Sequence, residues 1–315
     1  MSASDEPTAE APAEAGPEFG RTAGGGAAAK IRDTEWGNPV AGVFTSVAEQ
    51  PGAAKPDPII VADGVQRHFG GLTAVDVTHV EIQRGAITAL IGPNGAGKTT
   101  FFNLLSGFDK ADEGTVRFDG QLVTGVAPHL LAQRGMVRTF QLTKVLGKLT
   151  VLENMKLGNQ GQTGESMWKA LIKPMWRDQE RRVEAKALQI LDEFNMIHMK
   201  DEFAGALSGG QRKLLEMARS LMTDPKVIML DEPMAGVNPA LTQSLLGHVK
   251  RMRSQGITVV FVEHDMDVVR DISDWVVVMA EGIVVAEGTS ASVGANPAVI
   301  DAYLGTSHAS LTEGN

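Results

Sequence analysis

The sequence predicts an α/β fold in which a mostly parallel sheet is joined by an antiparallel β-subdomain and an inserted helical subdomain. Short apolar runs with the length of buried strands occur at residues 86–91, 227–230 and 258–262, with helical stretches between them. This alternation is typical of parallel strands joined by crossover helices. β-forming residues cluster between residues 59 and 118, and residues from about 141 to 206 follow a mostly helical pattern.

The antiparallel β-subdomain is predicted from the N-terminal half of the chain. Residues 59–61, 77–82 and 115–118 alternate or cluster β-forming side chains. Asp119 and Gly120 directly follow the last of these runs, and an Asp-Gly dipeptide is typical of a hairpin turn. We therefore expect this subdomain on the N-terminal side of the parallel core.

Helices and a closing hairpin are predicted in the second half. The inserted helical subdomain is expected at about residues 142–206, and its longest periodic run covers residues 177–196. A further helix opens at Ser208. The apolar runs at residues 275–280 and 283–286 predict a hairpin at the end of the domain.

Residues 1–55 differ in composition from the rest of the chain. Alanine, glycine, proline and glutamate dominate and large apolar residues are scarce, so this segment is predicted to be a disordered extension. One stretch departs from this pattern. Asn38 can cap a helix, Pro39 suits its first position, and apolar side chains from Val40 to Val47 share one helical face. The stretch is interpreted either as a transient helix or as an element that docks onto the body.

Length alone allows one or two domains, and the composition is that of a globular protein with a buried core. Of the 315 residues, 43% are hydrophobic and 21% are charged, as in ordinary globular proteins. We expect the folded domain at residues 56–305 and a flexible tail at residues 306–315. The formal net charge of -9 argues against a general nucleic-acid binder. The chain has 0 cysteines, which excludes disulfides and thiolate metal sites.

Membrane and targeting segments are not predicted. No apolar run approaches the roughly 18–20 residues that span a bilayer. The N-terminus lacks the basic segment and apolar core of a secretory signal, and its acidic residues argue against a transit peptide. We therefore expect a cytosolic body, so that any role in transport requires another chain to supply the membrane path.

A glycine-rich motif follows the apolar run at residues 86–91. It has the form GxxxxGK[ST] and comprises Gly92, Pro93, Asn94, Gly95, Ala96, Gly97, Lys98 and Thr99, followed by Thr100. The backbone N–H groups of such a P-loop wrap phosphate oxygens while the lysine supplies a positive charge. A helix predicted at residues 98–105 directs its positive end toward the phosphates. The strand–loop–helix context predicts a nucleoside triphosphate site.

Further motifs occur in a fixed order after the P-loop. They are Gln141, the stretch Leu207-Ser208-Gly209-Gly210-Gln211, the stretch Leu230-Asp231-Glu232-Pro233, and His264. Together with the P-loop they resemble the ATP-binding cassette (ABC) family, and the resemblance runs from about Pro58 to Gly305. It implies a P-loop NTPase core of the ABC ATPase type, which hydrolyses ATP with Mg²⁺ as the cofactor.

The phosphate and metal roles combine general chemistry with this resemblance. Lys98 should reach the β- and γ-phosphate oxygens, and the Thr99 hydroxyl should hold Mg²⁺. Asp231 ends an apolar strand, where its carboxylate can meet the metal directly or through water. Glu232 resembles the catalytic glutamate of the family, which orients the attacking water. The alternative for this acidic pair is a solvated strand end.

Three single residues gain a role only from the resemblance. It implies that Gln141 touches Mg²⁺ and the water, and that His264 hydrogen-bonds the γ-phosphate. Alone, either residue would more often be a surface or core side chain. Phe69 occupies the adenine-stacking position of the family, and the alternative is a plain β-core residue.

The stretch Ser208-Gly209-Gly210-Gln211 opens a helix. A serine and two glycines at a helix start make an anion site. In the ABC family two cassettes pair head to tail, so that this serine meets the nucleotide bound to the other subunit. The resemblance therefore implies a second ABC ATPase subunit, in a homodimer or a heterodimer.

One departure from the commonest ABC pattern indicates a branch of the family. After Glu232-Pro233 many cassettes read Ser-Ala-Leu-Asp, whereas this chain has Asn238 in place of that Asp and Pro239 after it. This loop and the stretch from Asn296 to Gly305 resemble the ATP-binding subunits of branched-chain amino acid importers. The resemblance implies a peripheral subunit on the cytoplasmic face of the plasma membrane. Its partners would be two permease subunits and, indirectly, an extracytoplasmic solute-binding protein, with no nucleic acid.

Other ABC functions remain open at this point. A urea or amide importer, or a lipid or other exporter, would share every catalytic residue. Non-transport ABC proteins usually carry two cassettes or a long coiled coil, whereas this chain has one cassette and no sustained heptads. For a transporter, the permease contact is expected near Gln141, with Leu142, Val145 and Leu146 as candidates.

Overall fold

The computed structural model describes residues 37–139, 145–159 and 173–303, which all lie in one compact unit that covers Ile31–Asn315. The expectations for residues 1–36, for Gln141 and Leu142, and for the tail at residues 306–315 fall outside the described residues.

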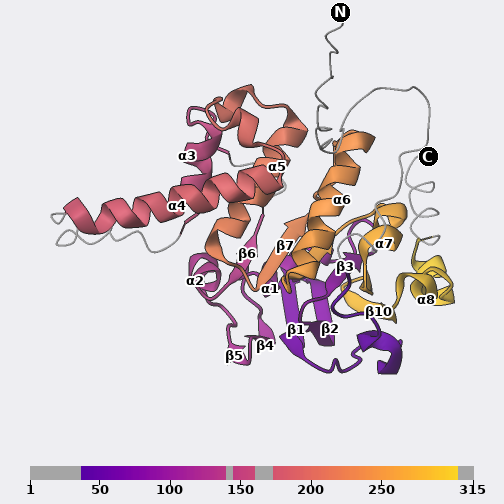
Figure 1. The fold of residues 1–315 in the computed structure, drawn as a ribbon. Helices are drawn as coiled ribbons and strands as arrows, with labels where there is room; N and C mark the ends of the chain where they lie inside the picture. The colour runs from indigo at the N-terminus through magenta and orange to yellow at the C-terminus, as the bar shows by residue number, and fades with distance from the viewer. Residues whose placement is uncertain (1–36, 140–144, 160–172, 304–315) are drawn as a thin grey trace, which may run out of the picture. The chain divides into compact units, whose positions relative to one another are not determined.

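A six-stranded sheet forms the core of this unit (Figure 1). Its order is β10-β9-β3-β8-β7-β6, and all neighbours are parallel except β9 and β10. The strands are β3 (Ile87–Ile91), β6 (Met136–Arg138), β7 (Val227–Asp231), β8 (Thr258–Val262), β9 (Trp275–Ala280) and β10 (Ile283–Gly288). The predicted mostly parallel core and closing hairpin are confirmed, whereas the short edge strand β6 was not predicted.

A second sheet has four strands and is antiparallel, in the order β2-β1-β4-β5. The strands are β1 (Pro58–Phe69), β2 (Leu72–Gln83), β4 (Glu113–Phe118) and β5 (Gln121–Leu122). The turn between β4 and β5 contains Asp119 at φ 49 and Gly120 at φ 75, the left-handed pair that two-residue hairpins require. This sheet is the β-subdomain that the sequence predicts.

Both faces of the six-stranded sheet are buried because successive side chains of a strand point to opposite sides. In β3, Ile87, Ala89 and Ile91 pack in one apolar cluster, which also contains side chains of α6 (Pro239–Ser254) and α7 (Met266–Ile272). Leu90 belongs to a second cluster, with α1 (Lys98–Leu105) and the four-stranded sheet. The P-loop between β3 and α1 is therefore supported from both layers.

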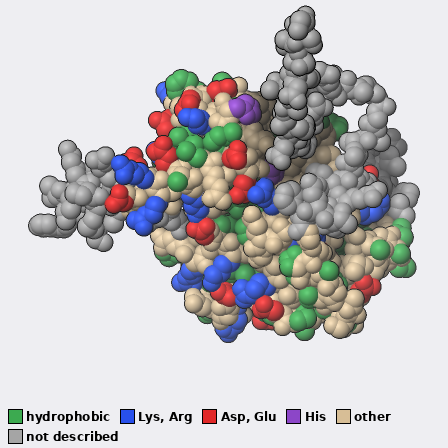
Figure 2. Space-filling view, in the orientation of Figure 1, with side chains coloured by type: hydrophobic (Ala, Val, Ile, Leu, Met, Phe, Trp, Pro, Cys, Tyr) green, Lys and Arg blue, Asp and Glu red, His purple; other side chains and the backbone are tan. Residues whose placement is uncertain are grey.

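Helical elements gather beside α5 in Figure 1. They are α3 (Val151–Lys156), α4 (Lys173–Glu193), η4 (Ile197–Met199) and η5 (Ala204–Ala206), followed by α5 (Gly209–Ser220) and η6 (Leu221–Thr223). Two short helices lie elsewhere along the chain, α2 (Pro128–Gln133) and α8 (Ser290–Gly294). On the face shown in Figure 2, acidic, basic and hydrophobic side chains are interspersed over α3 and α4. Within the described ranges, no helix is both long enough and apolar enough to cross a bilayer.

Residues 38–55, which precede β1, pack against the rest of the described chain. A short 3₁₀ helix, η2 (Val43–Ser46), lies in a segment that runs from Asn38 to Lys55 and contacts the β9–β10 hairpin. We call residues 38–55 the strap. Its side chains Val40 and Val47 are buried, and so is Lys55. The boundary expected at residue 56 is therefore corrected, and the docking interpretation of the stretch from Val40 to Val47 is the one that the structure supports.

Non-local contacts explain why the prediction of disorder from composition is wrong for the strap. The Phe44 ring stacks on Trp275 with centroids 4.8 Å apart. The Lys55 ammonium lies 3.0 Å from a Glu287 carboxylate oxygen, and both side chains are fully buried. Asn38 donates to Asp274 over 2.9 Å. Trp275 of β9 and the apolar cluster that contains Val47 and Ala53 provide apolar surface that the strap lacks in its own sequence.

Candidate functional site

The carboxyl ends of three adjacent parallel strands define the site. β3 lies next to β8, and β8 lies next to β7. The P-loop follows β3, and Glu263 and His264 follow β8. Asp231 is the last residue of β7, and Glu232 comes directly after it. Because parallel strands end at the same edge of a sheet, these motifs meet there. The sheet order brings together residues that lie more than a hundred positions apart in sequence.

The P-loop backbone takes a path that only glycine permits at two positions. Gly92 has φ 148, and a Cβ added there would come within 2.0 Å of the Met279 carbonyl oxygen. Gly97 has φ 90, and its Cβ would lie 2.4 Å from the Ala74 carbonyl oxygen. The loop is thus pressed against β9 on one side and β2 on the other. These contacts hold its N–H groups in place for a phosphate.

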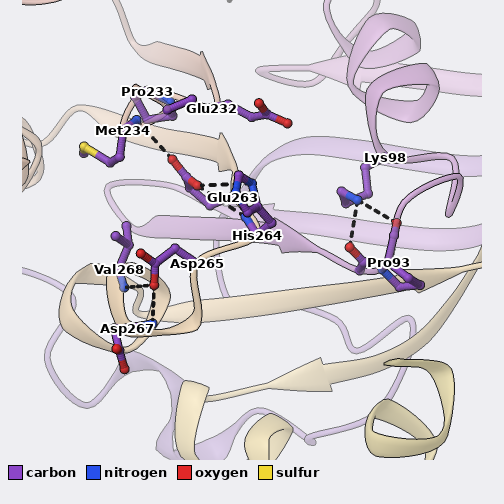
Figure 3. Close-up of polar contacts among 12 residues, drawn as sticks. Pro93, Lys98, Glu232, Pro233, Met234, Glu263, His264, Asp265, Asp267 and Val268 are labelled. Carbon is purple, nitrogen blue, oxygen red and sulfur yellow. Dashed lines mark hydrogen bonds and ion pairs between the residues drawn. The ribbon is translucent and has the colours of Figure 1, made fainter. Parts of the chain in front are cut away.

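Lys98 is the first residue of α1, and its side chain folds back over the P-loop. The ammonium donates to the carbonyl oxygens of Gly92 and Pro93 over 2.7 and 2.8 Å (Figure 3). Partial burial lowers the pKa of Lys98, and the nearby charge of Glu232 opposes this shift. The Thr99 side chain is exposed beside it. A cation and a hydroxyl therefore stand together where the loop meets the helix.

Asp231 is the last residue of β7 and is buried. The Arg138 guanidinium lies 2.8 Å from its Oδ2 atom. The same guanidinium donates to Asn103 over 2.6 Å and to Ser106 over 3.0 Å, so its position is fixed by α1 and the residue after it. Sequence reasoning did not assign Arg138 a role. The available signal was its position three residues before Gln141 at the end of an apolar strand, where a charged group requires a partner.

Glu232 has an unusual backbone for a glutamate. Its φ is 44, in the left-handed region that non-glycine residues rarely adopt. Its N–H donates to the Val262 carbonyl of β8 over 3.1 Å, which holds the residue at the sheet edge. In Figure 3 its side chain extends toward the side on which Lys98 lies. The Glu232 carboxylate also lies close enough to the Lys98 ammonium for their charges to interact.

His264 is exposed and follows the buried Glu263. Glu263 accepts hydrogen bonds from the N–H groups of Met234 and His264, over 3.1 and 3.3 Å (Figure 3). Burial raises the pKa of Glu263, and these hydrogen bonds oppose the shift. The next residue, Asp265, caps α7 by accepting from the Asp267 N–H over 2.9 Å. The histidine is thus held between a buried acid and a helix start, with its ring open to a ligand.

Ser208 caps α5 in a reciprocal pattern. Its hydroxyl accepts from the Gln211 N–H over 3.3 Å, and the Gln211 side chain accepts from the Ser208 N–H over 2.8 Å. This capping box explains why the helix begins at Gly209. Ser208 and Gly209 are exposed, and Gly210 is half-buried. The start of α5 is therefore largely exposed to solvent, as a contact with a second chain requires.

Phe69 ends β1 with half of its surface exposed, at 50%. The Arg67 guanidinium lies over the ring, 4.7 Å from its centroid. The alternative interpretation, a plain β-core residue, is therefore wrong. Adenine stacking at Phe69 stays a prediction.

Magnesium is the metal that the site chemistry implies. Among the described residues no group of three or more His, Asp or Glu side chains could hold a metal by itself. Magnesium in nucleotide sites needs less, because one or two protein oxygens act together with phosphates and water. The Thr99 hydroxyl and the Asp231 carboxylate are oxygen donors of the right kind, so the residues fit this ion.

The fold and this edge of the sheet define a P-loop nucleotide-binding protein. Comparison with known families narrows the class. The ABC transporter family matches residues 75–235, and a C-terminal family described as branched-chain amino acid ATP-binding cassette transporter matches residues 284–309. The chain belongs to the ABC transporter family.

Curated relatives give the same result. The probable branched-chain amino acid transport ATP-binding protein LivG of Archaeoglobus fulgidus is 42% identical over 247 residues, which cover 78% of this chain and 95% of the relative. The high-affinity branched-chain amino acid transport ATP-binding protein BraF of Pseudomonas aeruginosa is 40% identical over 250 residues, with 79% and 98% covered. Escherichia coli LivG is 37% identical over 250 residues, with the same coverage. The predicted resemblance to this branch is confirmed.

Solved structures share the fold. A nucleotide-free ATP-binding cassette from an ABC transporter aligns with a TM-score of 0.68 and 39% identity, covering 78% of this chain and 98% of the cassette. An ATP-binding cassette in its ADP conformation aligns with a TM-score of 0.68 and 38% identity, covering 79% and 99%. The predicted ABC ATPase fold is therefore confirmed.

Proposed function

We propose that this chain hydrolyses ATP to ADP and phosphate, with Glu232 as the residue that orients the attacking water. The observation that carries the proposal is the convergence of Lys98 and Glu232 at one edge of the sheet, each on a backbone fixed by neighbouring strands. Phosphoryl transfer requires charge neutralisation on one side of the γ-phosphate and an aligned water on the other. Lys98 supplies the charge and Glu232 accepts a hydrogen bond from the water.

The other site residues support these two. Thr99 and Asp231, joined by Gln141 as the sequence predicts, would hold Mg²⁺, which offsets the negative charge of the phosphates when bound. Arg138 keeps the Asp231 carboxylate in position. We expect His264 to donate to a γ-phosphate oxygen, and the exposure of its ring at the end of β8 supports this role.

The test is the substitution Glu232→Gln, which removes the charge and keeps the size. We expect ATP turnover to fall at least about 100-fold while ATP affinity stays near that of the unsubstituted chain. Glu281→Gln is a matched control, because Glu281 is also a glutamate with a left-handed backbone, at φ 49, and lies in the β9–β10 turn. Turnover by Glu232→Gln near the original rate would show that Glu232 is not the catalytic residue.

A second subunit is part of the proposal. The exposed start of α5 would meet the nucleotide of the other cassette, so that ATP binding brings two cassettes together and hydrolysis releases them. Glu232→Gln should therefore trap an ATP-bound dimer, measured by light scattering after size exclusion. A variant that stays monomeric at saturating ATP would mean that a different cassette is the partner.

We infer that this chain lies at the cytoplasmic face of the membrane and belongs to a complex with two permeases and a solute-binding protein. The complete complex imports branched-chain amino acids. The C-terminal family match at residues 284–309 and the names of the curated relatives support this assignment. Uptake of labelled leucine should be lost in cells that carry Lys98→Ala and have no redundant importer. Unchanged leucine uptake with ATPase activity lost would show that leucine is not the substrate, while the assignment as an ATPase would stand. Uptake of urea or short amides would indicate a related importer.

The permease contact is proposed at the loop before α3. Leu146 is 51% exposed, whereas Val145 packs partly against the large apolar cluster. Leu146 is therefore the better of the two positions for a cysteine crosslink to a permease in membranes. A permease that crosslinks only through the four-stranded sheet would contradict this placement.

A further inference from the structure

The loop after β7 carries Glu232 on a backbone that is unfavourable for its residue type. A left-handed conformation costs a glutamate about 1 kcal/mol relative to glycine. Two short-range bonds shape the loop itself, from the Ala235 N–H to the Glu232 carbonyl over 3.2 Å and from the Val237 N–H to the Met234 carbonyl over 3.2 Å. Such a conformation persists only where surrounding groups hold it.

Lys213 holds this loop from the side of α5. Its ammonium donates to the carbonyl oxygens of Glu232, Pro233 and Ala235, over 3.3, 3.0 and 2.5 Å. An ammonium has three N–H donors, so the number of donors matches the number of acceptors. Its side chain is partly buried, and burial lowers the pKa of Lys213 while the charges of Glu263, Glu216 and Glu232 oppose the shift.

Glu263 holds the same loop from the side of β8. Its carboxylate accepts from the Met234 N–H, so the loop is bound through its carbonyl groups by a cation and through an N–H by an anion. Glu263 is buried and belongs to the residue pair that positions His264. Lys213 and Glu263 thus restrain the loop from two different elements.

Lys213 lies on the first turns of the helix that Ser208 caps. The lysine therefore connects α5 to the backbone of Glu232 within one chain. We propose that Lys213 is a positioning residue, which fixes the Glu232 backbone so that its carboxylate is aligned for hydrolysis. The proposal rests on the proposed function, because it gives Glu232 the role of orienting water.

The test compares Lys213→Met with Lys213→Arg in the full-length chain. Methionine keeps the apolar stem and removes the charge and the N–H donors, whereas arginine keeps the charge and the N–H donors. We expect Lys213→Met to lower kcat about 10- to 100-fold with the KM for ATP and the Tm nearly unchanged, since small misplacements of a reacting group cost this much. Lys213→Arg should recover most of the loss.

Lys186→Met is the matched control. Lys186 also donates to a backbone carbonyl, that of Met222 over 3.0 Å, but it joins α4 to η6 away from the P-loop edge. Its kcat should be unchanged. An unchanged kcat for Lys213→Met, or a loss that arginine does not restore and that follows the loss of Tm, would overturn the proposal.

A double-substituted chain separates this inference from the proposed function. If Lys213 acts through Glu232, adding Lys213→Met to Glu232→Gln should cause no further loss of kcat. An additional 10-fold loss would mean that Lys213 acts by another route. If Glu232→Gln alone stays active, the proposed role of Glu232 fails first; if it is inactive while Lys213→Met is fully active, only the inference fails.

Discussion

The P-loop and the strap are two regions that pack against the same strand, and they use their lysines for opposite purposes. Lys98 donates to two carbonyl groups of its own loop, within six positions in sequence. Lys55 is fully buried and pairs with Glu287, 232 positions away. The first lysine lies at the loop that we propose binds a phosphate, whereas the second forms a buried ion pair between distant parts of the fold. A buried charge therefore indicates function only after its partner is known.

The largest effect is expected from removing the strap. A chain that lacks residues 1–55 loses Val40, Val47 and Lys55 and leaves Glu287 buried beside Trp275 without a cation. Its free energy of unfolding should fall by more than about 4 kcal/mol in urea titrations. A chain that lacks only residues 1–36 should unfold like the complete chain. Equal unfolding free energies for the two truncated chains would show that the strap contributes nothing to stability.

Lys55→Met isolates the ion pair from the rest of the strap. Removing one partner of a buried pair should cost about 3 kcal/mol of unfolding free energy, although the Trp275 and Gly52 N–H groups still donate to Glu287. Lys226→Met is the control, since Lys226 pairs with Asp119 at the surface and its loss should cost less than about 1 kcal/mol. ATP affinity should be unchanged in both. A cost as small as that of the control would show that the pair is not needed.

Lys98→Ala should behave in the opposite way. ATP affinity is expected to fall roughly 10- to 100-fold, because charge-assisted hydrogen bonds to phosphate are lost. The unfolding free energy without nucleotide should change by less than about 1 kcal/mol, since the hydrogen bonds of the ammonium to described residues stay within its own loop. Isothermal titration and urea unfolding give the two values. A large loss of stability would remove the contrast with Lys55.

The smallest effect is expected from Phe44→Ala. The ring is half-buried and stacks on Trp275 at an interplanar angle of 19°. The loss should be about 1–2 kcal/mol of unfolding free energy. Phe44→Leu keeps apolar volume without the stack and should recover part of it. No change with alanine would mean that the strap is held by its polar contacts alone.

Most of the core and the strand–loop–helix unit at the P-loop could be predicted from the sequence because the signals are local. The run Ile87–Ile91, the glycines after it and the helix at Lys98–Leu105 follow one another directly, and each is recognisable by composition and spacing. Asp119 and Gly120 likewise mark their hairpin without help from the rest of the chain.

The remainder depends on contacts that no local pattern encodes. Lys213 is one charged residue on an amphipathic helix, and only the fold brings the carbonyl groups of the β7 loop to it. Arg138 was similarly hidden in an edge strand of three residues. For the strap, the scarcity of apolar side chains predicted disorder. The sequence does not reveal that Phe44 of the strap packs on Trp275.

The left-handed backbone of Glu232 has a consequence for how this chain can change under selection. Glycine would adopt φ 44 without the steric penalty, but it would remove the carboxylate. If Glu232 orients water as proposed, selection for stability and selection for hydrolysis oppose each other at this position. A library sorted for thermal resistance alone should enrich glycine at both position 232 and position 281. The first enrichment would remove ATPase activity, and the second, at the β9–β10 turn, would leave it intact.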